Sequence, residues 1–371
     1  MALAVSGGGD SVALLNSVTP WARARGAHLQ ILTVDHGLRP ESSSEADAVE
    51  GASAVLNWPC KRLMWRQGAP AARRARVGRH SLLATACQEM GIEHLLLGHT
   101  LDDQLETVLI RARQGSGWYG LGGMDRLSPS PVWPAGEGLT LVRPLLDERR
   151  DALRAWLTDA GVRWIEDPTN EDAAYERVRV RRMLERAPGL RSRIAACLTH
   201  LSALRRAENL AMAASLETRV TAYPDASIDF DIDGLSEDRA TRLLGWLVQA
   251  VAGAASMPRE TVVRAALRSL SSGEAEARTL AGAWMVRGLN KTLSLYRDPG
   301  SIETAQSGTA LFDARFARAP AGEAIQPRDR RAKRASPPAE SGVWREMIGP
   351  RLAHLCSLWR HLPKLSHLDE A

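Results

Sequence analysis

A glycine-rich turn between an apolar segment and a helical pattern constrains this chain more than any other feature. Residues 6–11 read Ser-Gly-Gly-Gly-Asp-Ser and directly follow the apolar residues Leu3 to Val5. Three glycines let a ligand approach the main chain closely, and the free amides at the start of the next helix attract an anion. A turn that only caps a helix needs Asp10 or Ser11, but it does not need three glycines. The sequence therefore predicts a phosphate-binding loop after the first strand.

The first half of the chain alternates short apolar segments with helical patterns, which is the order that builds a parallel sheet covered by helices on both faces. We expect strands over about 3–5, 29–34, 60–65, 94–98 and 139–142, and helices over about 11–17, 44–56, 70–90 and 102–113. Ligands of such α/β sheets bind at the carboxyl ends of the strands. The residues directly after each strand are therefore the candidates for a functional site.

The second half has a different pattern, which indicates a separate α+β domain. We expect helices over about 193–217, 238–252 and 258–270, and strands over about 278–286 and 292–296. Beyond residue 299 the chain is rich in arginine, alanine and proline and has the character of a basic tail. We therefore predict a catalytic domain over 1–187, a smaller, mostly helical α+β domain over 188–299, and a tail over 300–371.

Composition narrows the classes of function. A formal net charge of +5 and an isoelectric point near 9.3 favour a polyanionic partner such as nucleic acid. The four cysteines form no Cys-x-x-Cys pair, which disfavours a disulfide framework and a zinc or iron–sulfur site. No apolar run approaches the length of about 18 residues that a membrane span needs, so we expect a cytoplasmic protein with no membrane partner.

The glycine-rich loop differs from the two most familiar phosphate loops. A Walker loop needs a lysine that is missing here, and a dinucleotide-binding loop would need a glycine where Val12 stands. The hexapeptide resembles instead the SGGxDS loop of the N-type ATP pyrophosphatases, the PP-loop proteins, whose parallel-sheet domain is adenine nucleotide alpha hydrolase-like. That resemblance implies that the loop binds ATP through Ser6, Gly7, Gly8, Gly9, Asp10 and Ser11.

A second group of polar residues follows the fourth predicted strand. Thr100 is placed to cap the next helix, whose first two turns carry Asp102, Asp103 and Glu106. Acids here stabilise a helix start through a capping box and the helix dipole, which is a sufficient structural explanation. They also form an acidic cluster beside the predicted phosphate loop, and carboxylate oxygens are the ligands that Mg²⁺ prefers. The two roles are compatible, and we favour a functional one.

Further motifs follow in a fixed order. They are Asp-His-Gly-Leu-Arg-Pro at 35–40, a glycine-rich segment at 115–124, Arg-Pro-Leu-Leu at 143–146, and Trp-Ile-Glu-Asp-Pro-Thr-Asn-Glu-Asp at 164–172. Each is weak alone, because a glycine-rich segment or an Asp-Pro turn is common. Together with the loop, they resemble the signature of the tRNA(Ile)-lysidine synthases over roughly Leu3 to Arg182. The chain departs from the family pattern at His80, Gln114 and Val178.

This resemblance implies an ATP-dependent carbon–nitrogen ligase. Members of the family adenylate C2 of the wobble cytidine in tRNA(Ile) with a CAU anticodon. The side-chain amine of L-lysine then displaces AMP, so the products are lysidine, AMP and pyrophosphate. On this basis we assign ATP and Mg²⁺ as cofactors, with Asp10 and Asp103 on the metal. The candidate catalytic residues are Asp10, Asp35, Asp102, Asp103, Glu106 and Arg143.

Two alternatives remain open at this point. A 2-thiocytidine synthase shares the loop, but that chemistry relies on paired cysteines that this chain lacks. A tRNA-binding protein with a degenerate nucleotide site is disfavoured by the intact loop together with Asp103. The sequence leaves a homodimer open. Arginines of the second half have two possible roles, which are to contact tRNA or to cover solvated helix faces. They are Arg193, Arg205, Arg206, Arg264 and Arg268.

Overall fold

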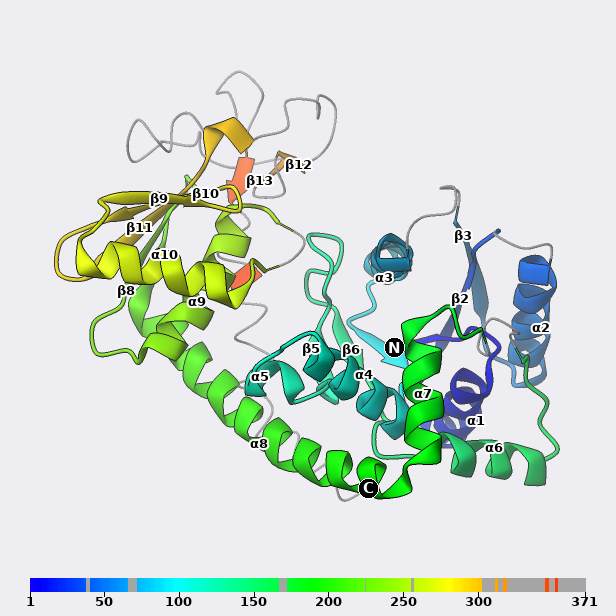
Figure 1. The fold of residues 1–371 in the computed structure, drawn as a ribbon. Helices are drawn as coiled ribbons and strands as arrows, with labels where there is room; N and C mark the ends of the chain where they lie inside the picture. Colours follow the sequence, from blue (N-terminus) through cyan, green and yellow to red (C-terminus); the bar gives the residue numbers. More distant parts are fainter. Residues whose placement is uncertain are drawn as a thin grey trace. The chain divides into compact units, whose positions relative to one another are not determined.

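The computed structural model describes residues 1–37, 41–65, 72–166, 172–223, 225–254, 257–301, 311–312, 316–318, 344–346 and 351–352. The chain forms two compact units, Met1–Ala207 and Glu208–Ala371 (Figure 1). The boundary between these units lies inside the long helix α8 (Pro188–Arg219). The division at 187 and 299 stays a prediction, and most of the predicted tail lies outside the described residues.

The first unit is built on a six-stranded sheet with the strand order β3-β2-β1-β4-β6-β5. Five strands are parallel, and β5 pairs with β6 in the antiparallel direction at one edge. The predicted α/β class and the five predicted strands are confirmed. The strands are β1 (Ala2–Ala4), β2 (Gln30–Asp35), β3 (Cys60–Met64), β4 (His94–Leu97), β5 (Leu127–Pro129) and β6 (Thr140–Val142).

Helices follow the strands as the sequence pattern predicts. The four predicted helices are present, and the first continues through Pro20 to Ala24 instead of ending near residue 17. Among the described residues, two further helices and one helical turn follow, and then the long helix that the sequence predicts over about 193–217, which continues into the second unit. The helices are α1 (Gly9–Ala24), α2 (Glu41–Val55), α3 (Ala72–Glu89), α4 (Leu101–Arg113), α5 (Trp118–Leu121), α6 (Arg150–Asp159), α7 (Glu176–Arg186) and α8.

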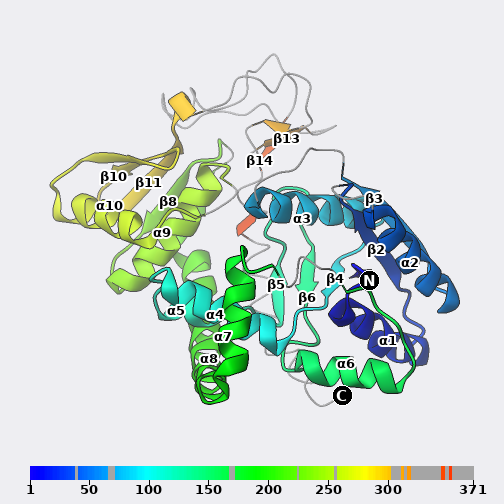
Figure 2. The ribbon, with the colours of Figure 1, turned by 45° about the vertical axis from the view of Figure 1, so that its right-hand side comes forward.

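Neighbouring strand residues supply two separate hydrophobic cores. Leu3, Ile31 and Leu96 pack with residues of α1 and α6, whereas Leu32 and Leu95 pack with residues of α3. Successive side chains of a strand point to opposite faces, so each near-continuous apolar strand supplies both cores. Figure 2 shows α3 on one side of the sheet and α1 and α6 on the other. This arrangement leaves the carboxyl ends of the strands for the site.

The second unit contains an antiparallel sheet with the order β7-β8-β11-β10-β9, on which α9 and α10 pack. The predicted strand over 278–286 is a hairpin, because Ala281 and Gly282 have φ values of 48° and 88° and form its turn. The elements are β7 (Val220–Ala222), β8 (Ile228–Asp231), α9 (Glu237–Val251), α10 (Glu260–Ser272), β9 (Ala277–Leu280), β10 (Ala283–Arg287) and β11 (Thr292–Arg297).

A short third sheet joins β12 (Leu311–Phe312), β13 (Phe316–Arg318) and β14 (Trp344–Glu346). The α+β character of the second half is therefore confirmed. Among the described residues, no helix combines the length and apolar character that crossing a membrane requires.

Candidate active site

The glycine-rich loop lies between β1 and α1, as predicted. Gly7 has a φ of +84°, which L side chains rarely adopt. A Cβ at Gly7 would lie 2.6 Å from Cδ1 of Ile165, and the main-chain N–H of Ile165 donates to the Gly7 oxygen over 2.9 Å. The loop therefore requires glycine at this position both for its conformation and for the close approach of Ile165.

Two serines fix the rest of the loop. The Ser11 hydroxyl donates to the Gly8 oxygen over 2.9 Å, and the Ser6 main-chain N–H donates to the Ser11 Oγ over 3.2 Å. Helix α1 starts at Gly9. Its N-cap residue is Gly8, which has no side chain that could cap the helix. An uncapped helix start presents main-chain N–H groups and the positive end of the helix dipole, so this loop is suited to an anion.

A second glycine brings the two main motifs together. Gly98 follows β4, and a Cβ there would lie 2.9 Å from the main-chain oxygen of Asp10. This close approach places the start of α4 beside the first turn of α1. The acids of both helices therefore reach one shared cluster.

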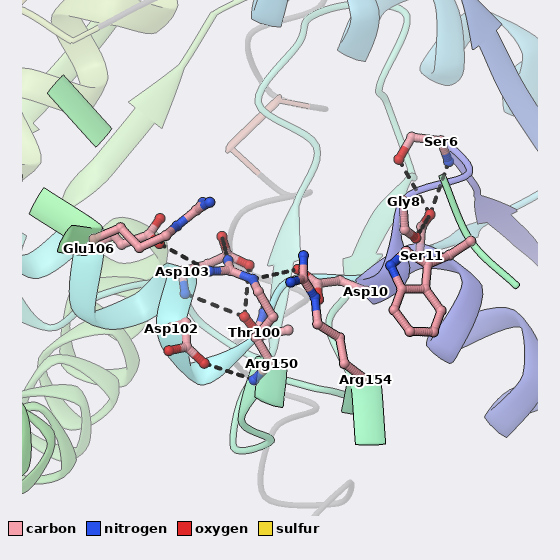
Figure 3. A network of polar contacts seen from close by, with 12 residues as sticks. Ser6, Gly8, Asp10, Ser11, Thr100, Asp102, Asp103, Glu106, Arg150 and Arg154 are labelled. Carbon is pink, nitrogen blue, oxygen red and sulfur yellow. Dashed lines mark hydrogen bonds and ion pairs between the residues drawn. The ribbon is translucent and has the colours of Figure 1, made fainter. Parts of the chain in front are cut away.

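Arg150, at the start of α6, lies at the centre of that cluster (Figure 3). Its Nε donates to Oδ2 of Asp10 over 3.1 Å, its Nη2 to Oδ1 of Asp103 over 3.1 Å, and its Nη1 to Oε1 of Glu106 over 3.3 Å. Its main-chain N–H donates to Oδ2 of Asp102 over 2.8 Å. Four of the six predicted catalytic residues are thus brought together by one arginine.

Helices α7 and α8 supply further arginines to the acids of α4. Arg177 donates to Oε2 of Glu106 over 2.6 Å and to Oδ1 of Asp103 over 2.9 Å. Arg181 donates to Oε1 of Glu106 over 2.9 Å, and Arg191 donates to Oδ1 of Asp102 over 2.6 Å. The acidic cluster is therefore neutralised by guanidinium groups.

Asp103 combines the two roles that its position predicts. Its Oδ2 accepts the main-chain N–H of Thr100 over 2.9 Å, and its own N–H donates to Oγ1 of Thr100, so the capping box is confirmed. Burial raises the pKa of the Asp103 carboxyl, but Arg177, Arg150 and the Thr100 hydrogen bond oppose it and hold the pKa below its usual range. Asp103 therefore stays ionised in the cluster at neutral pH.

Asp10 differs from Asp103 in having a spare oxygen. Its Oδ1 is buried and has no hydrogen-bond partner among the described residues. Burial raises the pKa of the Asp10 carboxyl above its usual range, although Arg150 partly offsets this. A buried carboxylate oxygen without a donor is suited to a cation, because leaving it unpaired costs free energy.

The donor set fits Mg²⁺ only together with a ligand. Among the described residues, no group of three or more His, Cys, Asp or Glu side chains is placed to hold a metal. Mg²⁺ bound with nucleotides typically takes one or two carboxylates and completes its shell with phosphates and water. Oδ1 of Asp10 fits that pattern. Oδ1 of Asp103 fits it only if Arg150 or Arg177 releases it.

The other two predicted catalytic residues lie apart from these contacts. Asp35 ends β2, and its Oδ1 accepts the main-chain N–H of Gly37 over 3.0 Å. Arg143 is buried and donates to Oγ of Ser128 over 2.9 Å and to a main-chain oxygen beside β5. No contact recorded among the described residues joins either side chain to Arg150. Residues 38–40 and 167–171, which complete two of the motifs, lie outside the described residues.

Two histidines adjoin this region, His80, which is buried, and His99, which is half-buried. Nδ1 of His99 has no hydrogen-bond partner among the described residues, and burial together with Arg143 lowers its pKa to about 3. Burial and nearby Arg79 lower the pKa of His80 to about 4. Both rings are therefore neutral at pH 7.

Sequence reasoning missed Arg150, Arg191 and His99 as members of this region. His99 stands inside the motif before α4, and Arg150 follows the Arg-Pro motif by a few residues, so position was the only available signal. Val178, which departs from the family pattern, lies in the core and leaves Arg177 and Arg181 on the face toward Glu106. This substitution therefore preserves the arginine contacts.

Most of the arginines proposed for tRNA contact are paired within the fold. Arg205 is buried and bonds to the glycine-rich segment after α4, whereas Arg264 and Arg268 pair with acids of α9 and α10. Arg193 and Arg206 are exposed, and no ion pair is recorded for them among the described residues. Of these five arginines, these two are therefore the ones without an acidic partner recorded in the described part of the chain.

Comparison with known proteins identifies the class to which this fold and site belong. Residues 1–187 match the family model of the PP-loop domain. The loop after β1, the parallel sheet and the acids after β4 are all within that match. Fold and site together define an ATP-binding PP-loop protein.

Individual relatives narrow the assignment. The chain is 44% identical over 281 residues to the tRNA(Ile)-lysidine synthase of Hyphomonas neptunium, covering 76% of this chain and 77% of that protein. It is 35% identical over 323 residues to the enzyme of that name from Caulobacter vibrioides, covering 84% and 70%, and 44% identical over 191 residues to that of Bradyrhizobium diazoefficiens, covering 50% and 51%. The chain belongs to the tRNA(Ile)-lysidine synthase family.

A solved structure of the U34-tRNA thiolase NcsA from Methanococcus maripaludis is also similar. The match covers 54% of this chain and 71% of that one, with 17% identity and a TM-score of 0.46. This likeness is too distant to add to the assignment.

Proposed function

We propose that this chain joins the side-chain amine of L-lysine to C2 of the wobble cytidine in tRNA(Ile) with a CAU anticodon. ATP is split into AMP and pyrophosphate in the process. Family membership supports the reaction. One observation carries the proposal. The guanidinium of Arg150 bonds to Asp10, from the glycine-rich loop, and to Asp103 and Glu106, from α4.

In this proposal the glycine-rich loop binds the phosphates of ATP. Main-chain N–H groups of the loop and of the first turn of α1 would hold the departing pyrophosphate. Asp10 and Asp103 would hold Mg²⁺, which when bound supplies positive charge beside the phosphates. Arg150 would then release these two carboxylates, and its guanidinium is free to contact a phosphate oxygen instead.

The second half-reaction needs a carboxylate near the amine. A lysine amine has an ordinary pKa near 10.4, so it arrives protonated and must lose a proton before it attacks C2. The candidates remain Asp35, Asp102 and Glu106. Asp35 is the least engaged of the three, since its nearest recorded cation is Nη1 of Arg62 at 3.9 Å from Oδ2. It is therefore the first to test for an effect on the KM for lysine.

The decisive experiment is mass analysis of the wobble cytidine after incubation of tRNA with the protein, ATP and lysine. A mass increase equal to lysine minus water, together with AMP release that depends on both tRNA and lysine, is the expected result. An unmodified cytidine under conditions in which the protein binds tRNA would contradict the proposal. We further propose a cytoplasmic location, and a homodimer is a separate expectation that sedimentation analysis tests.

A further inference from the structure

Two neighbouring aromatic side chains, one exposed and one partly exposed, lie outside the residues that the reaction uses. Trp118 and Tyr119 open α5, with ring centroids 5.8 Å apart and ring planes at 79°. The Trp118 residue is 37% exposed, and Tyr119 is partly exposed beside it. Large rings are usually placed where they bury most of their surface, so two neighbouring rings that stay accessible point to a binding surface.

The backbone on which the pair stands is held in place. Nη1 of Arg111 donates to the main-chain oxygens of Gly120 and Gly123 over 2.7 Å and 3.0 Å. Nη1 of Arg205 donates to the same Gly123 oxygen over 2.6 Å. A surface that is already ordered loses little conformational entropy when a ligand binds.

A further pair of bonds fixes the far end of this segment. The side-chain amide of Gln104 donates to the main-chain oxygen of Met124 over 2.8 Å, and the Met124 N–H donates back over 2.6 Å. Gln104 belongs to α4, one residue after Asp103. The helix that presents the acidic cluster thus also anchors the segment that presents the rings.

Helix α4 links the cluster to the segment that carries the rings. Asp103 is in its first turn, and Gln114 follows its last residue, so at 1.5 Å per residue the two ends are about 16 Å apart. A base that reacts at the cluster belongs to an unpaired RNA loop, whose other bases are splayed and available for stacking. Because α5 packs on α4, the rings and the cluster are presented from one helix, and we take a base near the reacting one as the occupant.

Charges on α4 and α8, the two helices whose arginines hold this segment, suit a polyanion. Arg113, at the end of α4, has a side chain that is 55% exposed and only a loose pairing of 3.7 Å with Glu176. Arg206, on the helix that carries Arg205, is exposed and has no ion pair recorded among the described residues. Aromatic faces flanked by arginines are the combination that binds single-stranded nucleic acid.

We infer that Trp118 and Tyr119 form a stacking platform for an unpaired base of the anticodon loop other than the one that reacts. This inference rests on the proposed function, because it takes the RNA from it. It adds a specificity-determining contact, since a stacked base must be unpaired and positioned at a fixed distance from the reacting cytidine.

The test compares ring variants in the full chain. Trp118→Phe keeps a stacking face, Trp118→Leu keeps apolar bulk without one, and Trp118→Ala removes both. Trp21→Ala is the matched control, because Trp21 is also 37% exposed but lies on α1, against Arg25. Each protein is titrated with an anticodon stem-loop RNA bearing CAU and with a blunt RNA duplex.

We expect Trp118→Ala and Trp118→Leu to weaken stem-loop binding by about 5- to 150-fold, the usual effect of losing one stacked base. Trp118→Phe and Trp21→Ala should stay within about 3-fold of the unchanged protein, and duplex affinity should not change. Equal binding by Trp118→Leu and Trp118→Phe would overturn the inference, as would an equal loss on the duplex. Unchanged RNA binding with a smaller sedimenting mass would assign the rings to a protein contact instead.

Failure of the proposed function has a different signature. In that case the unchanged protein would bind the stem-loop no better than the duplex, or would leave the cytidine unmodified. Failure of the platform alone leaves the unchanged protein active and all four variants equal to it.

Discussion

Replacing Arg150 with methionine removes one guanidinium from three carboxylates at once. The Arg150 side chain is 11% exposed, and those of Asp103 and Glu106 are 13% and 1% exposed. Breaking a buried ion pair by deleting one partner costs about 3–5 kcal/mol, because it leaves a charge buried and uncompensated. Asp103 and Glu106 keep Arg177, whereas Asp10 has no other recorded hydrogen-bond donor. We therefore expect Arg150→Met to lower the opening free energy of the first unit by about 3 kcal/mol, the lower end of that range.

The stability deficit of Arg150→Met should depend on pH, because the protonation of the carboxylates around Arg150 changes with pH. The pKa of Asp10 is already raised by burial, and without Arg150 it should rise further. A carboxyl whose folded pKa is raised gives stability below its unfolded pKa, and that stability is lost as pH rises through the folded value. The pKa of Asp103 is held low, so its stabilisation is present above its unfolded pKa and is lost as pH falls. Both effects make the deficit of Arg150→Met largest at neutral pH and smaller near pH 4.

Native-state hydrogen exchange of α4 and α6 amides is the appropriate assay, because it reports the opening free energy of the first unit separately from the second. The control is Arg149→Met, since the Arg149 side chain is 54% exposed and the ion pair recorded for it among the described residues is with the exposed Asp151. Exposed pairs contribute about 0–1 kcal/mol, so the control should change little. Mg²⁺ added together with ATP should restore part of the lost opening free energy in Arg150→Met. Equal opening free energies for both variants, at pH 7 and without Mg²⁺, would refute the central role of Arg150.

Three further predictions concern the reaction. Asp10→Asn should lower AMP formation by about 10²–10³ in rate while Asp151→Asn leaves it near normal, as a coupled pyrophosphate assay measures; equal rates would remove Asp10 from the site. Gly7→Ala should abolish ATP binding, as measured by calorimetry. Adding Ile165→Ala should relieve the 2.6 Å contact but not the strain of the positive φ at residue 7. Full recovery of ATP binding in the double variant would show that the backbone conformation at residue 7 does not limit binding. Chromatography of the nucleotide products should give AMP, and ADP as the main product would be incompatible with the family mechanism.

Features that depend on neighbouring residues were predictable from the sequence. The loop, its place after β1, the parallel strands and the capping box at Thr100 all follow from local order, and the structure contains them. The acids of α4 were predictable as a cluster because residues three or four apart lie on one side of a helix. Asp10 joins them because β1, which precedes the glycine-rich loop, pairs with β4, which precedes α4.

Contacts between distant residues were not predictable in the same way. Arg150 meets Asp10 across 140 positions and Glu106 across 44, and no spacing rule connects them. The strand β5 was missed because it is three residues long and lies in a segment rich in glycine and proline. The arginines of α10 were ambiguous for a related reason, since their charge is visible in the sequence but their pairing with Glu237 and Asp238 is not.

The arginine contacts also bear on where the functional unit ends. The family model matches residues 1–187, yet Arg191 lies beyond that range and donates to Asp102 over 2.6 Å. Arg205, further along α8, donates to the main-chain oxygen of Gly123 over 2.6 Å. A boundary at 187 would leave Asp102 without its guanidinium partner and the glycine-rich segment without one of its anchors. We therefore propose that the catalytic unit includes α8 at least as far as Arg205, because the charges of the motifs are balanced only when that helix is present.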